Sequence, residues 1–369
     1  MIKMSDKITP ILMPKWGLSM SEGTLAAWHV EEGAEISPGD EIMDVETDKI
    51  ANVVEAADGG LLRRKVGNEG EVYPVRMLLG VMAPSSVTDA EIDTYVNDYE
   101  MPEVEEDEDT GPNYEFADLG VGKIRYTERS GEGTPVLLIH GFGGDLDNWL
   151  FNIDALSETA PAYALDLPGH GQSVKPADSA DLDLMVSAIV QLMDHLNIEQ
   201  AHLVGHSMGG LIAGQTAISY PSRVASVSLI CSAGLGAEIN DDYIDGFVGA
   251  QSRKELKPKL KYLFADQGLV SRSMVDDLLK YKRLDGVQSF LERLKANLFD
   301  NGKQSVSLKD GLKKVDCPKQ IIWGEEDAII PQSHANAIDG ATVSVVSGAG
   351  HMVQMEESSQ VNELIKEIL

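Results

Sequence analysis

The stretch Asp44-Val-Glu-Thr-Asp-Lys-Ile-Ala-Asn-Val-Val54 decides how the first part of the chain folds. Polar residues 46–48 separate two apolar runs, Ile42–Val45 and Ile50–Val54, and Lys49 lies at the centre. This pattern predicts two strands joined by a tight turn with a lysine at its tip. A turn tip is accessible from outside and free to move. On its own, the stretch fits a solvated hairpin lysine equally well.

An internal repeat places this turn in a larger unit. Residues before the turn match residues after it at a fixed offset, and the matched positions are mostly glycine, proline and aliphatic residues. The pairs are Gly23 with Gly59, Leu25 with Leu61, Val30 with Val66, Ile36 with Val72, Pro38 with Pro74, Ile42 with Leu78 and Val45 with Val81. Two halves built from short alternating strands predict a small β-sandwich with Lys49 at their junction.

The motifs of this region resemble a known family. They are Met13-Pro-Lys-Trp-Gly-Leu-Ser-Met-Ser-Glu-Gly23, Pro38-Gly-Asp40 and Glu46-Thr-Asp-Lys-Ile50, and residues 8–83 resemble a lipoyl domain of the 2-oxo-acid dehydrogenase type. The resemblance implies a flattened all-β barrel or sandwich with lipoic acid in amide linkage on Lys49. Biotin is the weaker alternative, because biotin-carrying domains place methionines on both sides of their lysine and this chain has Asp48 and Ile50 there.

Composition restricts the class of protein. The chain has 369 residues, 43% of them hydrophobic, and a formal net charge of −30, which makes nucleic acids and anionic membranes poor partners. The two cysteines, Cys231 and Cys317, have neither the number of a disulfide framework nor the spacing of a metal site, so we expect no metal. The N-terminus lacks the apolar core of a signal peptide, and no apolar run has the length of a membrane span. We therefore expect a soluble cytoplasmic protein.

An acidic segment separates the first domain from the rest. Residues 84–113 contain 11 Asp or Glu and no Lys or Arg, which predicts a flexible linker. Part of Asp89–Tyr99 has helical spacing and is compatible with one short helix. A basic subunit-binding module, which many lipoyl-bearing acyltransferases place after this linker, is not recognisable in the sequence.

Residues 114–369 show a different pattern. After an expected β-hairpin at 114–127, apolar strands alternate with amphipathic helices, which predicts a mostly parallel sheet covered by helices. The expected buried strands are 135–139, 162–166, 201–205, 224–231, 320–323 and 343–346. Between about 234 and 315 strands are missing and helical patterns dominate, so we expect an inserted helical cap there.

The second domain carries a complete set of residues for nucleophilic catalysis. Gly205-His-Ser-Met-Gly209 follows an expected strand and opens an expected helix, which is the context of a nucleophile elbow with Ser207 at its tip. A serine needs a base and the base needs an orienting acid. His351 follows the last strand and Asp327 follows the strand before it, in the chain order Ser, Asp, His of this fold.

Two backbone N–H groups are expected to form the oxyanion hole. One belongs to Met208, directly after the nucleophile, and the other to Phe142 in His140-Gly-Phe-Gly-Gly144. Losing one such donor costs about 3–4 kcal/mol of barrier lowering. His140, His170 and His206 flank these motifs and are expected to have structural roles. With this triad pattern, residues 114–369 resemble an α/β-hydrolase over their whole length.

The two domains together resemble the dihydrolipoamide acetyltransferase components of acetoin dehydrogenase (acetoin-cleaving) systems. This resemblance implies acetyl transfer from S-acetyl-dihydrolipoyl-lysine to coenzyme A, a thiamine-diphosphate enzyme that loads the acetyl group, and a flavin-dependent dihydrolipoamide dehydrogenase that reoxidises the dithiol. The His-x-x-x-Asp-Gly signature of typical lipoyl acyltransferases is missing, since His334 is one residue too far from Asp339-Gly340. Two alternatives remain: a serine-triad thioesterase or esterase that carries a lipoyl domain, and a lipoyl carrier with a non-catalytic docking domain.

Overall fold

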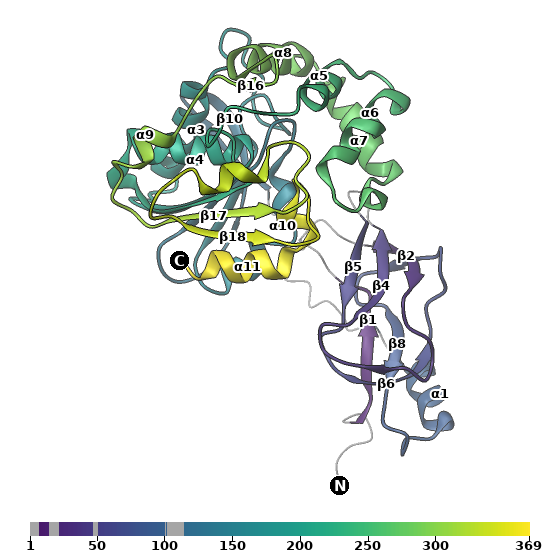
Figure 1. Cartoon of the computed structure of the whole chain (residues 1–369). Coiled ribbons are helices and arrows are strands. Elements are labelled where there is room, and N and C mark those ends of the chain that lie inside the picture. The colour runs from purple at the N-terminus through teal and green to yellow at the C-terminus, as the bar shows by residue number, and fades with distance from the viewer. Residues whose placement is uncertain (1–6, 15–21, 47–50, 100, 102–113) are drawn as a thin grey trace. The chain divides into compact units, whose positions relative to one another are not determined.

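The computed structural model describes residues 7–14, 22–46, 51–99, 101 and 114–369 (Figure 1). The chain divides into two compact units, one built mainly from residues 1–112 and the other mainly from residues 113–369. The expected multidomain fold, an all-β unit followed by an α/β unit, is confirmed. Within the described ranges, no helix is both long enough and apolar enough to cross a membrane.

The first unit consists of two four-stranded sheets whose strand orders are β1-β8-β6-β3 and β5-β4-β2-β7. An offset of 36 residues carries β2 onto β6, β3 onto β7 and β4 onto β8, so the two sheets are the two halves of the sequence repeat with their short edge strands exchanged. The strands are β1 (Thr9–Leu12), β2 (Glu22–Trp28), β3 (Glu35–Ile36), β4 (Glu41–Glu46), β5 (Ala51–Glu55), β6 (Gly60–Lys65), β7 (Val72–Pro74) and β8 (Leu78–Met82).

Strands β4 and β5 flank the stretch that contains Lys49. These strands pair antiparallel with Glu46 opposite Ala51, so four residues join them. Three residues of β4, Ile42, Met43 and Val45, are buried in the core of this unit. Lys49 itself lies outside the described residues.

Helix α1 (Asp89–Asn97) lies in the segment that we expected to be linker. It begins with a capping box in which Thr88 and Glu91 bond reciprocally, and its Ile92 is fully buried in a cluster with Leu78 and Val81 of β8. Ion pairs from Arg63 and Arg64 to Asp89 and Asp93 hold the helix further. A cap and a few apolar residues thus order the beginning of the acidic segment against the first unit.

The second unit has an eight-stranded sheet in the order β18-β17-β14-β13-β11-β12-β10-β9. Strand β10 runs antiparallel to both of its neighbours, β9 and β12. The strands β12, β11, β13, β14, β17 and β18 run parallel to one another. The strands are β9 (Tyr114–Leu119), β10 (Gly122–Arg129), β11 (Val136–Ile139), β12 (Ala162–Leu165), β13 (Ala201–His206), β14 (Val224–Ile230), β17 (Lys319–Gly324) and β18 (Thr342–Val346).

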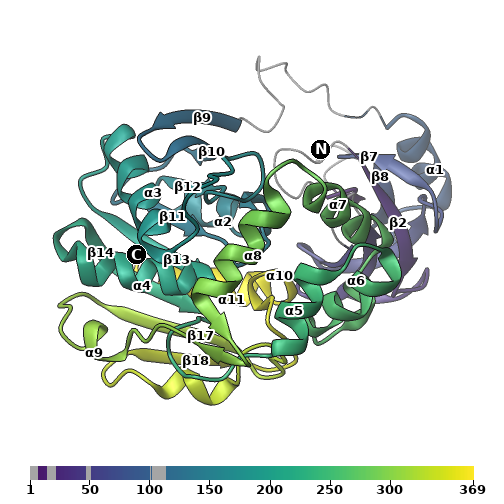
Figure 2. The same ribbon diagram turned by 90° about the horizontal axis from the view of Figure 1, so that it is seen from above.

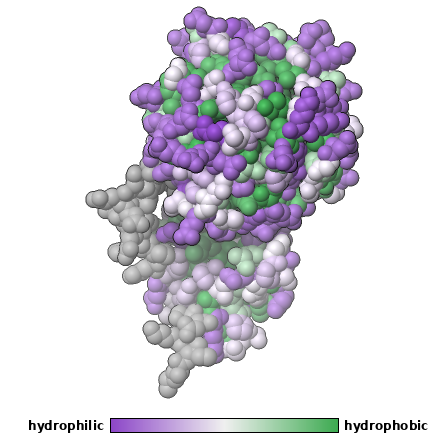
Figure 3. Space-filling view, turned by 90° about the vertical axis from the view of Figure 1, so that its left-hand side faces the viewer, coloured by the Kyte–Doolittle hydropathy of each residue, from purple (hydrophilic) through white to green (hydrophobic). Residues whose placement is uncertain are grey.

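Helices cover both faces of this sheet (Figure 1). Helices α3 and α4 pack together on one side, and α2 and α11 pack together on the other. Their bounds are α2 (Ile153–Ser157), α3 (Leu182–His195), α4 (Met208–Ser219) and α11 (Ser358–Lys366). On one face of this unit, hydrophilic side chains surround scattered hydrophobic ones (Figure 3), as is normal for a folded domain.

In the sequence, a helical insertion separates β14 from β17 (Figure 2). It contains α5 (Asp241–Gly249), α6 (Arg253–Leu260), α7 (Arg272–Lys282) and α8 (Val287–Leu298). A two-residue hairpin, β15 (Phe299–Asp300) with β16 (Lys303–Gln304), follows α8 in a stretch where we expected no strands. The helices lie inside the range expected for a cap.

Candidate active site

Ser207 occupies a strained turn between β13 and α4. Its backbone has φ 54° and ψ −116°, a region that non-glycine residues seldom adopt and that is found at nucleophile elbows. Close packing explains the glycines around it. A Cβ on Gly205 would lie 2.2 Å from the carbonyl oxygen of Gly209, and a Cβ on Gly209 would lie 2.0 Å from that of Ile139.

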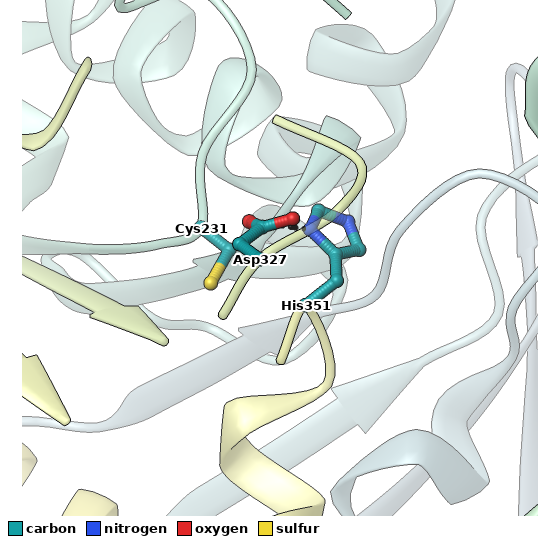
Figure 4. Close-up of side chains that lie close together, drawn as sticks. All are labelled: Cys231, Asp327 and His351. Carbon is teal, nitrogen blue, oxygen red and sulfur yellow. Dashed lines mark hydrogen bonds and ion pairs between the residues drawn. The ribbon is translucent and has the colours of Figure 1, made fainter. Parts of the chain in front are cut away.

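His351 and Asp327 form a buried hydrogen-bonded pair. Nδ1 of His351 donates to Oδ2 of Asp327 at 2.8 Å, and the two side chains are 2% and 0% exposed (Figure 4). The other oxygen, Oδ1, accepts bonds from the backbone N–H groups of Ile329 and Ile330 at 2.8 and 3.0 Å. The acid is thereby held in one orientation, with the imidazole directed by it.

His206 connects the elbow to the histidine loop. Its Nε2 donates to the carbonyl oxygen of His351 at 2.9 Å, and the two rings lie 4.7 Å apart between centroids. Burial lowers the pKa of His206 well below its ordinary value, so the ring is neutral. Because His206 directly precedes Ser207, this contact brings the nucleophile candidate beside the buried pair.

Two backbone segments that were expected to supply the oxyanion hole adjoin Ser207. Met208 is the first residue of α4, where an N–H group has no intrahelical acceptor. In the second segment, a Cβ on Gly141 would lie 3.1 Å from Cβ of Ser207, so the loop that contains Phe142 runs directly against the elbow. His140 holds this loop, since its Nδ1 donates to Gly141 at 2.8 Å and its Nε2 accepts from Leu167 N–H at 3.0 Å.

Apolar side chains from the insertion cover these loops. The Phe142 ring makes edge contacts with Phe247 of α5 and Phe299 of β15 at 6.0 and 5.9 Å. A Cβ on Gly169 would collide with the ring of Phe290 on α8. The insertion therefore packs on the loops beside Ser207 and surrounds them with a low-polarity environment, which strengthens electrostatic interactions there.

Cys231 is a neighbour of the pair that sequence reasoning missed. Its Sγ, a carboxylate oxygen of Asp327 and a ring nitrogen of His351 lie within 4.8 Å of one another (Figure 4). Burial, and after it the charge of Asp327, raises the pKa of Cys231 well above its ordinary value. The protonated thiol is suited to hydrogen bonding, and its Sγ accepts from Gly324 N–H at 3.4 Å. The backbone of Cys231 has a positive φ of 43°, which no motif in the sequence predicts.

Glu356 is a second residue without a sequence signal. Its two carboxylate oxygens accept from the N–H groups of Gly350, beside His351, and of Ala265 in the insertion, both at 2.7 Å. Burial raises the pKa of Glu356 to about 6. This side chain ties the histidine loop to the cap.

The strands on either side of Lys49, the candidate carrier lysine, are among the described residues. Glu46 ends β4 with an exposed side chain, and Ala51 begins β5 opposite it. The four residues between these paired positions, Lys49 among them, lie outside the described residues. The attachment of a prosthetic group to Lys49 stays a prediction.

Comparisons with known proteins agree with both units. Residues 9–79 match a family model described as biotin-requiring enzyme, and residues 134–358 match one described as alpha/beta hydrolase fold. A meta-cleavage product hydrolase from Pseudomonas fluorescens IP01 superposes with a TM-score of 0.63 at 27% identity, covering 69% of this chain and 96% of that chain.

Two curated relatives match essentially the whole chain. The dihydrolipoyllysine-residue acetyltransferase component of the acetoin cleaving system from Cupriavidus necator is 52% identical, covering 100% of this chain and 99% of that protein. The protein with the same description from Pseudomonas putida is 48% identical over 97% of each. The chain therefore belongs to the family of dihydrolipoyllysine-residue acetyltransferase components of acetoin-cleaving systems.

Proposed function

We propose that this chain transfers the acetyl group of an S-acetyl-dihydrolipoyl-lysine, carried on its own Lys49, to coenzyme A within an acetoin-cleaving complex. Membership of the family supports acetyl transfer. The buried His351–Asp327 pair, which a hydrogen bond links to His206, the residue next to Ser207, is the observation that carries the assignment of residues. Lipoic acid, when attached, supplies a thiol that carries the acetyl group as a thioester.

In the first half of the reaction, Oγ of Ser207 attacks the acetyl carbonyl carbon. His351 takes the serine proton, and Asp327 stabilises the imidazolium that results. The N–H groups of Met208 and Phe142 bind the oxyanion of the tetrahedral intermediate. When the carbon–sulfur bond breaks, His351 gives its proton to the departing thiolate, and the acetyl group remains on Ser207.

In the second half, the thiol of coenzyme A replaces water as the nucleophile. His351 removes its proton, the new carbon–sulfur bond forms, and the ester bond to Ser207 breaks. The proton returns from His351 to Oγ of Ser207, so the enzyme is restored. Transfer competes with hydrolysis, and the apolar cover formed by Phe142, Phe247 and Phe290 favours transfer by excluding water.

The carrier unit explains the partners. A thiamine-diphosphate enzyme that cleaves acetoin loads the acetyl group, and a flavin-dependent dehydrogenase reoxidises the dithiol after unloading. Because the carrier is tethered to the second unit, its acetyl group has an effective concentration in roughly the millimolar range, as is typical of short flexible linkers. Tight intrinsic affinity for the dihydrolipoyl group is then unnecessary.

The deciding experiment uses S-acetyl-dihydrolipoamide with and without coenzyme A. We expect acetyl-CoA, and we expect Ser207→Ala to abolish it. Release of acetate at the same rate whether or not coenzyme A is present would favour the hydrolase alternative, which the likeness to a meta-cleavage product hydrolase keeps open. Acetyl-CoA formation that Ser207→Ala leaves intact would contradict both serine mechanisms.

A further inference from the structure

Helix α6 concentrates positive charge on a strongly acidic chain. The chain as a whole has a net charge of −30, yet residues 253–261 hold five Lys or Arg and one acidic residue. That residue, Glu255, is turned back to the start of its own helix, where Oε2 accepts from Gln251 N–H at 2.9 Å. A local cationic surface therefore stands out against a field that repels anions.

Two of the five basic residues have structural partners. Arg253 pairs with Asp276 of α7, and Lys259 pairs with Asp242 of α5 at 2.7 Å, so both fasten α6 to its neighbours. The other three, Lys254, Lys257 and Lys261, have no ion-pair partner in the part of the chain that the structure describes.

These three residues form the lysine stripe. Lys254 and Lys257 lie in α6, and Lys261 is its C-cap with helical φ and ψ angles. Their spacing of i, i+3 and i+7 therefore puts them on one face of the helix, beside the face that buries Leu256 and Leu260. The side chains of Lys254 and Lys257 are exposed and that of Lys261 is half-buried. The stripe extends about 10 Å along the helix axis, at 1.5 Å per residue.

The end of the stripe lies next to the histidine loop. Two residues after Lys261, the carbonyl oxygen of Leu263 accepts from Met352 N–H at 2.9 Å, and Met352 follows His351. Gly350 packs on the same segment so closely that a Cβ there would lie 2.7 Å from Ala265 N. The stripe thus leads along the cap to the backbone of the proposed general base.

We propose that the lysine stripe binds the phosphate groups of coenzyme A and so directs its thiol toward Ser207. The inference rests on the proposed function, which requires a polyanionic acceptor at this site. An acceptor with several phosphate charges is repelled by a chain of charge −30, and a row of exposed lysines beside His351 supplies the local attraction. Lysine binds phosphate as a point charge without demanding a fixed geometry.

The test compares two acceptors and two triple variants. The stripe variant is Lys254→Gln, Lys257→Gln and Lys261→Gln. The control is Lys309→Gln, Lys313→Gln and Lys314→Gln in and after α9 (Lys309–Leu312), which makes the same change in charge and lies far from α6 (Figures 1 and 2). The acceptors are coenzyme A and pantetheine, which has the same thiol arm and no phosphates.

We expect the stripe variant to raise KM for coenzyme A about tenfold, as three exposed charge contacts together would. kcat at saturating coenzyme A, and kcat/KM for pantetheine, should remain unchanged, as should all constants of the control. A stripe of three arginines should restore KM. Equal losses with both acceptors, or equal losses in both variants, would overturn the proposal.

Direct binding separates this proposal from the proposed function. Calorimetry of coenzyme A with Ser207→Ala measures affinity without turnover, and adding the stripe substitutions should weaken it about tenfold. If coenzyme A binds through the stripe and no acetyl-CoA forms in the wild type, the proposed function fails and the site stands. If stripe substitutions slow only the reaction with the partner enzymes, the stripe docks an acidic protein and the proposal is wrong.

Discussion

The two units differ in what they bury. Among the described residues, all buried polar and charged side chains lie in the second unit, and the core of the first is formed by aliphatic residues and methionines. In the sequence of the first unit, the lysine candidate lies between the residues of β4 and β5. The second encloses Asp327, His351 and their supports, at the desolvation cost that buried polar groups carry. A carrier needs a stable frame, whereas a catalytic site needs fixed polar groups.

The largest effect is expected from removing the nucleophile. Ser207→Ala should lower kcat for acetyl transfer about 10⁶-fold, as loss of a triad serine does elsewhere. The measurement is acetyl-CoA formation from free S-acetyl-dihydrolipoamide. Lys49→Arg is the matched control from the other unit. It should leave this rate unchanged while stopping the reaction of the assembled complex, and a loss with the free substrate would contradict the division of labour.

The next effect concerns the acid. Asp327→Asn should lower kcat about 10⁴-fold, because an amide no longer favours the tautomer and charge of His351 that the reaction needs. KM should change little, since Asp327 is buried behind His351 and does not contact the substrate. Stopped-assay kinetics at several pH values check this. Glu325→Gln, on the same loop with an exposed side chain, is the control, and an equal loss there would point to loop distortion.

A third difference lies in the acid sensitivity of the two units. Burial lowers the pKa of His140 to about 4, that of His170 to about 3, and that of His206 well below the ordinary value. These rings stay neutral in the folded state while the unfolded chain binds protons below pH 6.5, so stability is lost as the pH falls from there. The pKa of Glu356 is raised to about 6, so between about pH 4.5 and 6 this carboxylate takes up a proton on folding. That proton offsets the one that a single buried histidine takes up on unfolding.

The second unit should therefore lose unfolding free energy as the pH falls below 6.5, by about 1.4 kcal/mol per pH unit for each net proton that unfolding takes up. Urea unfolding at pH 7, 6 and 5 measures the slope. His170→Asn should reduce it by about 1.4 kcal/mol per pH unit, the contribution of one proton. His29 is the only histidine in the described part of the first unit, and it is exposed. An equally steep, histidine-dependent loss of unfolding free energy with falling pH in the first unit would contradict the comparison.

The last prediction concerns the first unit alone and should leave catalysis unchanged. Ile92→Ala removes the fully buried residue of α1 and should cost about 3 kcal/mol, within the range of such deletions. The unfolding transition of the first unit should shift, and acetyl transfer from free S-acetyl-dihydrolipoamide should not. Exposed Thr94→Ala on the same helix is the control. If the helix belonged to a flexible linker, neither substitution would change stability.

Motifs, repeats and the order of motifs along the chain predicted much of this molecule. The duplicated strands, the glycines around Ser207 and the order of Asp327 and His351 along the chain can all be read from the sequence. The packing of α1, the thiol of Cys231 and the bridge made by Glu356 cannot, because each depends on residues far away in sequence. Glu356, for example, meets Ala265 across 91 positions. No local motif marks such partners.

The central claim is that Ser207 carries the acetyl group between the two thiols. The direct test is the intact mass of the Lys49→Arg variant after rapid mixing with S-acetyl-dihydrolipoamide in the absence of coenzyme A, followed by peptide mapping. We predict one acetyl group on the peptide that contains Ser207, which disappears as acetyl-CoA forms when coenzyme A is added. Acetyl-CoA formed at the full rate with no acetyl group ever found on Ser207 would contradict the account.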